Sequence, residues 1–148
     1  MQLLLYNSAM NLGAEQQFLV GEPPEGETEL VIASFPPASK GLGAVFEDDG
    51  TTGYFYVVDQ GGEDMEMLDA LHIYDVADVT DKQEPVTAQI FWNEEENAVA
   101  LILNGTCHAL YDVKRQAGFC RNAFPEAKNG QTEPRVLTDE LVEQYFAA

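Results

Sequence analysis

Two pairs of side chains have the types and spacing that acid–base chemistry needs. Asp69 and His72 are three positions apart, and His108 and Asp112 are four positions apart. A histidine beside a carboxylate can transfer a proton near neutral pH, so each pair is a candidate general base. On a strand, Asp69 and His72 would point to opposite faces, whereas His108 and Asp112 would share one. Because a histidine in a strand is more often structural, we assign catalysis to neither pair.

Two further groups of residues have the types that bind metals. Cys107 and Cys120 with His72 and His108 have the right types for zinc, but their spacing fits no zinc-ligand pattern. The run 47–50, Glu-Asp-Asp-Gly, has carboxylates for calcium, but they are adjacent rather than alternating. We therefore predict no metal and no other cofactor. We expect two free thiols and a charged hairpin turn.

The sequence has no motif of a known catalytic machinery. It contains no G-x-S-x-G nucleophile elbow, no glycine-rich loop that ends in Lys-Ser or Lys-Thr, and no H-E-x-x-H zinc motif. We therefore predict that the protein is not an enzyme.

The acidic residues of a hairpin turn and of the loop after it are the best candidates for a binding site. If the turn and the loop lie close together, their carboxylates form one patch that suits a basic protein partner. The set is Glu47, Asp48, Asp49, Glu63, Asp64, Glu66 and Asp69. A second acidic turn lies at 94–96. The alternative interpretation is that all of these residues are solvated turns that keep the protein soluble.

The charge of the whole chain supports a basic partner. The sequence has 26 acidic and 7 basic residues, a formal net charge of -19 over 148 residues. Residues 1–81 contain 16 acidic residues and one lysine (1 − 16 = −15), and the rest contain 10 acidic and six basic residues (6 − 10 = −4). Such self-repulsion destabilises a fold. It also disfavours direct binding to nucleic acid or to anionic membranes, which need basic side chains.

Short β-rich segments bounded by glycine and proline must position these residues. The expected strands cover 2–6, 17–20, 29–35, 42–47, 54–59, 70–75, 86–92, 98–103 and 107–113, with an edge strand within 118–124. Asn104-Gly105 predicts a tight hairpin. In the segment 54–59, Tyr54 and Tyr56 share one face and Phe55 and Val57 the other. We expect this strand to be central and covered on both faces.

A helix should follow near the end of the chain, capped by Thr138 and with one buried face that includes Val142 and Phe146. The sequence therefore predicts one α+β domain over residues 1–148, a mainly antiparallel β-sheet with a C-terminal helix. No stretch reaches the roughly 18 apolar residues of a membrane span. The segment 1–7 also lacks the basic start of a signal peptide, so we expect a cytoplasmic protein.

Three segments resemble a small bacterial family of unknown function. The run 44–56, Ala-Val-Phe-Glu-Asp-Asp-Gly-Thr-Thr-Gly-Tyr-Phe-Tyr, is similar to the family's signature hairpin. The runs 68–74 and 118–125 resemble later parts of the family, so the likeness extends over residues 42–125. Members of that family are linked to the immunity proteins of contact-dependent growth inhibition systems. Such proteins bind the toxic C-terminal domain of a cognate surface effector in the cytoplasm and neutralise it.

For this chain the resemblance implies a Whirly-like fold and, as partner, a toxin of the EndoU-like ribonuclease class. Whirly-type proteins bind nucleic acid, and the net charge of -19 argues against that activity here. The resulting hypothesis is an immunity protein that occludes the active site of a basic ribonuclease toxin. The alternative is a small enzyme or ligand-binding domain that uses the His, Asp and Tyr side chains, which a deep apolar pocket around His72 or His108 would favour.

Overall fold

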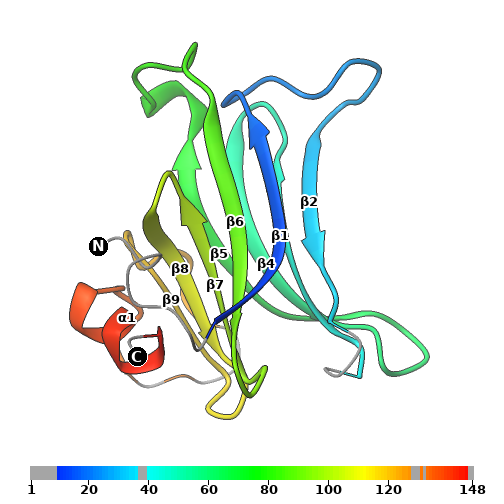
Figure 1. Cartoon of the computed structure of the whole chain (residues 1–148), viewed down its shortest axis with the longest axis vertical. Coiled ribbons are helices and arrows are strands. Elements are labelled where there is room, and N and C mark those ends of the chain that lie inside the picture. The colour runs from blue at the N-terminus through cyan, green and yellow to red at the C-terminus, as the bar shows by residue number, and fades with distance from the viewer. Residues whose placement is uncertain (1–9, 37–39, 128–130, 132, 147–148) are drawn as a thin grey trace.

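The chain forms two antiparallel β-sheets and one short C-terminal helix (Figure 1). The computed structural model describes residues 10–36, 40–127, 131 and 133–146. The predicted architecture, mainly antiparallel sheet with a C-terminal helix, is confirmed. The strand expected at 2–6 lies outside the described residues.

The first sheet has five strands in the order β1-β6-β7-β8-β9. Its strands are β1 (Met10–Phe18), β6 (Val86–Asn93), β7 (Ala98–Leu103), β8 (Thr106–Asp112) and β9 (Ala117–Cys120). The predicted meander corresponds to β6–β8, and the expected edge strand to β9. Asn104 and Gly105 join β7 to β8 with φ angles of 48° and 82°, which a tight two-residue hairpin requires.

The second sheet has four strands in the order β2-β3-β4-β5. Its strands are β2 (Leu30–Ser34), β3 (Leu42–Asp48), β4 (Thr52–Asp59) and β5 (Glu66–Asp75), and a 3₁₀ turn η3 (Val76–Asp78) follows. β5 begins at Glu66, earlier than the expected start near position 70. Each strand pairs with the next one along the chain, so consecutive turns lie at alternate ends of this sheet.

The main core lies between the inner faces of the two sheets. Phe46, Phe55 and Leu71 from the four-stranded sheet pack in one buried cluster with Ile90 and Leu101 from the five-stranded sheet. On β2, buried and exposed residues alternate strictly, which is the pattern that a half-buried strand produces.

The helix α1 (Asp139–Phe146) covers the outer face of the five-stranded sheet (Figure 1). Val142 and Phe146 are fully buried there in a second cluster with Phe91 of β6. Oγ1 of Thr138 accepts a hydrogen bond from the N–H of Leu141 at 3.2 Å, so the predicted helix cap is confirmed.

The four-stranded sheet has no described helix over its outer face. On β4, Phe55 and Val57 are fully buried in the core, whereas Tyr54 and Tyr56 on the opposite face are only half-buried. The expectation that β4 is central is confirmed, but the expectation that both of its faces are covered is wrong. Tyrosine tolerates this position because its ring packs on the sheet while its hydroxyl reaches water.

Candidate functional site

Asp48 in the predicted acidic set is part of the internal structure. It is buried at the end of β3, and its carboxylate accepts hydrogen bonds from Gly21 N at 2.8 Å, Gly50 N at 2.8 Å and Tyr74 Oη at 2.6 Å. These contacts join the β3–β4 turn to the loop after β1 and to β5. The Asp48 carboxylate therefore holds three segments together rather than facing a partner.

Asp49 lies at the exposed tip of the same turn. Its Oδ1 accepts hydrogen bonds from Thr52 N at 2.8 Å and from Thr51 N at 2.9 Å. These two backbone donors hold the pKa of Asp49 below its ordinary value. Asp49 is thus an ionised turn residue that solvent and a partner can both reach.

Glu63 and Asp64 in the loop and Glu66 at the start of β5 are exposed, but they lie at the other end of β4. An eight-residue strand spans about 25 Å at roughly 3.3 Å per residue. The expectation that the turn and the loop lie close together is therefore wrong, because β4 separates them. The acidic turn 94–96 belongs to the five-stranded sheet, between β6 and β7.

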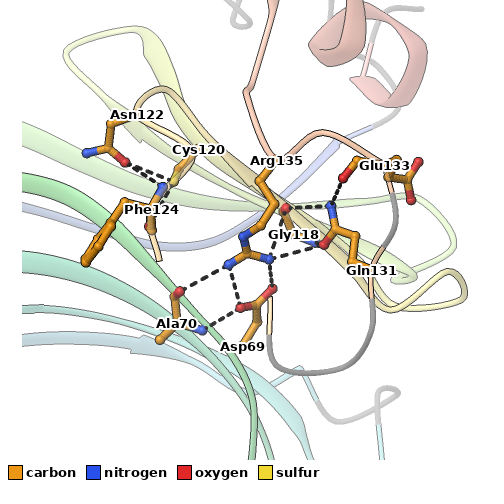
Figure 2. Close-up of polar contacts among 9 residues, drawn as sticks. All are labelled: Asp69, Ala70, Gly118, Cys120, Asn122, Phe124, Gln131, Glu133 and Arg135. Carbon is orange, nitrogen blue, oxygen red and sulfur yellow. Dashed lines mark hydrogen bonds and ion pairs between the residues drawn. The ribbon is translucent and has the colours of Figure 1, made fainter. Parts of the chain in front are cut away.

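Asp69 is buried in an ion pair with Arg135, as Figure 2 shows. The pair is bidentate, with Nη2–Oδ1 at 2.9 Å and Nη1–Oδ2 at 3.0 Å, and each side chain is 7% exposed. Nη1 of Arg135 also donates to Oε1 of Gln131 at 3.1 Å. At Gly118 of β9 a Cβ atom would lie 2.2 Å from Oδ2 of Asp69, so the ion pair fills the space that a side chain would need. Asp69 thus fastens the C-terminal segment to both sheets.

Glu47 is the only member of the predicted acidic set on the open outer face of the four-stranded sheet. It lies directly opposite Val31 of β2 and Tyr54 of β4, and Tyr54 lies opposite His72 of β5. These four side chains form one row across all four strands. We define the outer face as this row together with the neighbouring Tyr56.

Aromatic rings form a continuous series of contacts across the outer face. The rings of Tyr54 and Tyr56 stack with centroids 5.7 Å apart and an interplanar angle of 14°. The edge of Tyr54 meets His72 at 5.3 Å, and His72 meets Phe124 at 5.8 Å and 90°. The His72 ring is also fixed at both nitrogens, by Asn122 and by Asp75 at 2.9 Å. The rings are therefore held in place before any partner binds.

Glu47 has unusual electrostatics for a surface carboxyl. Its pKa is raised to about 7, first by burial, then by a hydrogen bond with the Glu29 carboxyl and by the negative charges of Glu29 and Asp49. The pKa of Tyr56 is also raised, by burial and by the charge of Glu47. The strand alternation of β4 predicted that Tyr54 and Tyr56 share one face, which is confirmed, but no sequence signal joined Glu29 to Glu47.

The two His/Asp pairs do not form the couples that their spacing suggested. Asp69 points into the core and His72 to the outer face, as the strand geometry predicted, and His72 pairs with Asp75 instead. His108 and Asp112 were expected to share a face, and this expectation is wrong. Asp112 accepts a hydrogen bond from Tyr145 Oη of α1 at 2.6 Å, whereas His108 lines a pocket at one end of the inter-sheet core. The pairing between β7 and β8 shifts register beside His108, which breaks the simple alternation.

The pocket beside His108 is open and mostly apolar. It has a volume of about 310 Å³ and is lined by Phe18, Val20, Ile73 and Leu103 among others. Burial lowers the pKa of His108 to about 4, and the charge of Arg121 lowers it as well, so this imidazole is neutral at pH 7.

The cysteines do not form a reactive or metal-binding site. Cys107 and Cys120 are free and buried, as predicted, and burial raises the pKa of the Cys107 thiol to about 12. Within residues 10–36, 40–127, 131 and 133–146, no three His, Cys, Asp or Glu side chains are grouped so that they could hold a metal ion. No helix in the described part of the chain is long and apolar enough to cross a membrane.

Comparison with known proteins places the chain in a bacterial family. The model of the family described as "Uncharacterized protein conserved in bacteria (DUF2251)" matches residues 24–146. The chain belongs to this family. The predicted membership of a bacterial family of unknown function is thus confirmed. The DUF2251 match contains all four strands of the four-stranded sheet and leaves out β1, so the outer face lies within it.

One relative is an uncharacterized protein of Haemophilus influenzae, 30% identical over 117 residues, which cover 79% of this chain and 69% of that protein. No solved structure matches the chain. The Whirly-like character of the fold therefore stays a prediction.

Proposed function

We propose that the protein is an immunity protein of a contact-dependent growth inhibition system. It binds the basic, EndoU-like ribonuclease toxin domain of a cognate effector in the cytoplasm and neutralises it by occluding the toxin's active site. It acts by binding alone, without chemistry and without a cofactor. The observation that carries the proposal is the open outer face of the four-stranded sheet, where fixed aromatic rings lie beside acidic side chains.

The composition of this face is typical of a protein interface. Tyrosine is enriched where proteins bind one another, because its large ring adds contact area at little entropic cost and its hydroxyl can form hydrogen bonds with water or with a partner. Two large apolar side chains here are also open to solvent: Val31 within the row at 48% exposure, and Phe124, which contacts His72, at 54%. Exposed apolar side chains beside fixed aromatic rings are compatible with an interaction site.

The distribution of charge favours a basic partner for this face. All three arginines are already in ion pairs: Arg115 with Glu133 and Arg121 with Asp139 on the side of the five-stranded sheet, and Arg135 with Asp69 of β5. A ribonuclease must present basic side chains to hold RNA phosphates. An acidic cap competes with RNA for those side chains, and opposite charges speed capture of a toxin that has entered the cell.

The test is a titration of the toxin domain encoded immediately upstream. A fixed amount of that domain cleaves RNA while the protein is added in increasing amounts. We expect cleavage to fall to zero at one equivalent and to return in full when the complex is separated under denaturing conditions and the toxin is refolded. Inhibition by far less than one equivalent, or a toxin that stays chemically modified, would contradict the proposal.

The pocket beside His108 supports a second candidate, a domain that binds a small apolar ligand. Its volume of about 310 Å³ is at the lower end of the range for ligand sites, and its lining is apolar apart from Tyr74, Asn104 and His108. Titration with indole, followed by NMR shifts of Leu103 and Val20, tests this function. Saturable shifts confined to these residues would support it. If no shifts occur, the pocket is a packing gap at the end of the core and this second function is wrong.

A further inference from the structure

The two carboxyls of Glu29 and Glu47 lie next to the stacked tyrosines on the outer face. The register of β2 against β3 places Val31, two residues after Glu29, directly opposite Glu47, and the Glu29 carboxyl raises the pKa of Glu47. The charges that raise the pKa of Glu47 are those of two acids, Glu29 and Asp49. A cation placed beside Glu47 would therefore be attracted to this end of the sheet.

The one basic residue within the span of the four-stranded sheet is far from this group. Lys40 precedes β3, and its neighbour Gly41 accepts a hydrogen bond from Gln60 N at 2.8 Å, so Lys40 lies beside the loop after β4. Glu47 is at the opposite end of β3. Lys40 therefore lies near the acidic loop that follows β4. The charged residues named around Glu47 are all acidic.

We propose that the outer face is the surface on which the toxin domain docks, and that it receives an arginine side chain of that domain. The guanidinium group lies against the Glu47 carboxylate and over the ring of Tyr54. This inference rests on the proposed function and adds to it the surface and the anchoring contact.

The chemistry of the face favours arginine over lysine. A guanidinium group is planar, so it can stack on an aromatic ring while its N–H groups form two parallel hydrogen bonds with a carboxylate. Glu47 and Tyr54 are direct neighbours across β3 and β4, so one guanidinium can reach both. Its positive charge also removes the repulsion between Glu29 and Glu47. The contact is made by groups that are already in position, which reduces the entropy lost on binding.

The first part of the test compares variants of the outer face with matched variants elsewhere. Glu47→Gln keeps the size of the side chain and removes its charge, and Glu63→Gln makes the same change at the other end of β4. Val31→Arg adds a bulky cation to the face, and Leu12→Arg does so on β1, where the exposure of 52% is close to the 48% of Val31. Affinity for the upstream toxin domain is measured by titration calorimetry, and folding by thermal unfolding.

We expect Glu47→Gln and Val31→Arg to weaken binding at least about tenfold, because each removes or blocks a charge-assisted contact at the centre of the interface. The two controls should change affinity by less than about threefold, as rim charges do. If the wild type binds the toxin domain but the two face variants behave like their controls, the inference is wrong and the proposed function stands. If the wild type does not bind that domain at all, the proposed function fails, and the inference fails with it.

The second part identifies the partner's side chain. Each arginine on the basic surface of the toxin domain is replaced by lysine and tested against the wild type and Glu47→Gln. One replacement should weaken binding to the wild type at least about tenfold and weaken binding to Glu47→Gln much less, which is the coupling expected of two groups in contact. If no arginine shows this coupling with Glu47, the arginine contact is wrong.

Discussion

Glu47 and His108 should respond to pH in opposite directions, because burial disfavours a negative charge on one and a positive charge on the other. The pKa of Glu47 rises from 4.5 to about 7 on folding, so between these values the folded state holds more protons than the unfolded state. Glu47 therefore stabilises the fold less and less as pH rises through this range. The pKa of His108 falls from 6.5 to about 4, so its effect on stability has the opposite sign between those values.

We predict that Glu47→Gln gains stability relative to the wild type as pH rises. At pH 4.5 the Glu47 side chain is protonated and resembles glutamine, whereas above pH 7 it carries an unfavourable charge beside Glu29 and Asp49. The difference in Tm, variant minus wild type, should increase between pH 4.5 and pH 7.5 and then level off. Thermal unfolding across this series measures it, and a constant difference would show that Glu47 titrates as an ordinary surface carboxyl.

The ion pair of Asp69 and Arg135 gives the second prediction at this scale. Asp69→Asn leaves the buried guanidinium of Arg135 without its counter-charge, which should cost about 3–5 kcal/mol of unfolding free energy. The control is Glu133→Gln, which breaks a partly exposed ion pair with Arg115 and should cost about 1 kcal/mol or less. Urea unfolding measures both variants. Equal losses would mean that Asp69 contributes only as a surface charge.

At the scale of elements, the sequence predicted most strands because their signals are local. The Asn104-Gly105 turn, the apolar alternation of β7 and β8, and the Thr138 cap need only neighbours along the chain. β1 was expected only at 17–20, because the apolar residues of its segment Met10–Phe18 do not keep a period of two. It is a strand because β6 pairs with it along its length.

The candidate site was harder to predict, because it depends on which turns share an end of a sheet. The alternation of β3 alone places Glu47 and Asp48 on opposite faces, and this could have been read from the sequence. The position of Asp69 depends on Arg135, which is 66 residues away in the chain, and no local pattern contains that contact. The Glu29–Glu47 pair likewise needs the register between β2 and β3.

The β3–β4 turn leads to a prediction about Asp48. Its carboxylate accepts hydrogen bonds from two backbone N–H groups and from Tyr74 Oη. Asp48→Asn replaces one acceptor oxygen with a donor and should cost about 1–3 kcal/mol of unfolding free energy. Glu63→Gln, in the exposed loop at the other end of β4, should change stability by less than about 0.5 kcal/mol. Chemical denaturation of both variants decides whether Asp48 is structural, and a neutral Asp48→Asn would contradict this account.

At the scale of the whole molecule, charge is divided between the two sheets. Residues 1–81, which contain the four-stranded sheet and β1, carry a net charge of −15. All three arginines lie after them in the sequence, Arg115 and Arg121 in ion pairs on the side of the five-stranded sheet and Arg135 in the pair with Asp69. The four-stranded sheet is left as an acidic body with an aromatic outer face. Long-range attraction of a basic partner is therefore directed at the side of the molecule that carries the proposed contact.

The negative electrostatic potential of the four-stranded sheet should increase the association rate of the proposed toxin partner. We predict that the association rate falls at least about tenfold between low salt and 0.5 M NaCl, since the Debye length at about 0.15 M is already only about 8 Å. The dissociation rate should change much less. Stopped-flow fluorescence with the upstream toxin domain measures both rates. An association rate independent of salt would contradict electrostatic steering and would mean that the net charge serves solubility alone.

The tyrosines allow the most direct test of the docking face. Tyr54 and Tyr56 lie on the outer face, whereas Tyr145 lies on α1 at the other side of the molecule. In protein with ¹³C-labelled tyrosine, we expect the ring signals of Tyr54 and Tyr56 to shift and saturate at one equivalent of toxin domain. The ring signals of Tyr145 should stay where they are. Shifts confined to Tyr145, or no shift of Tyr54 and Tyr56 at saturation, would contradict docking on the four-stranded sheet.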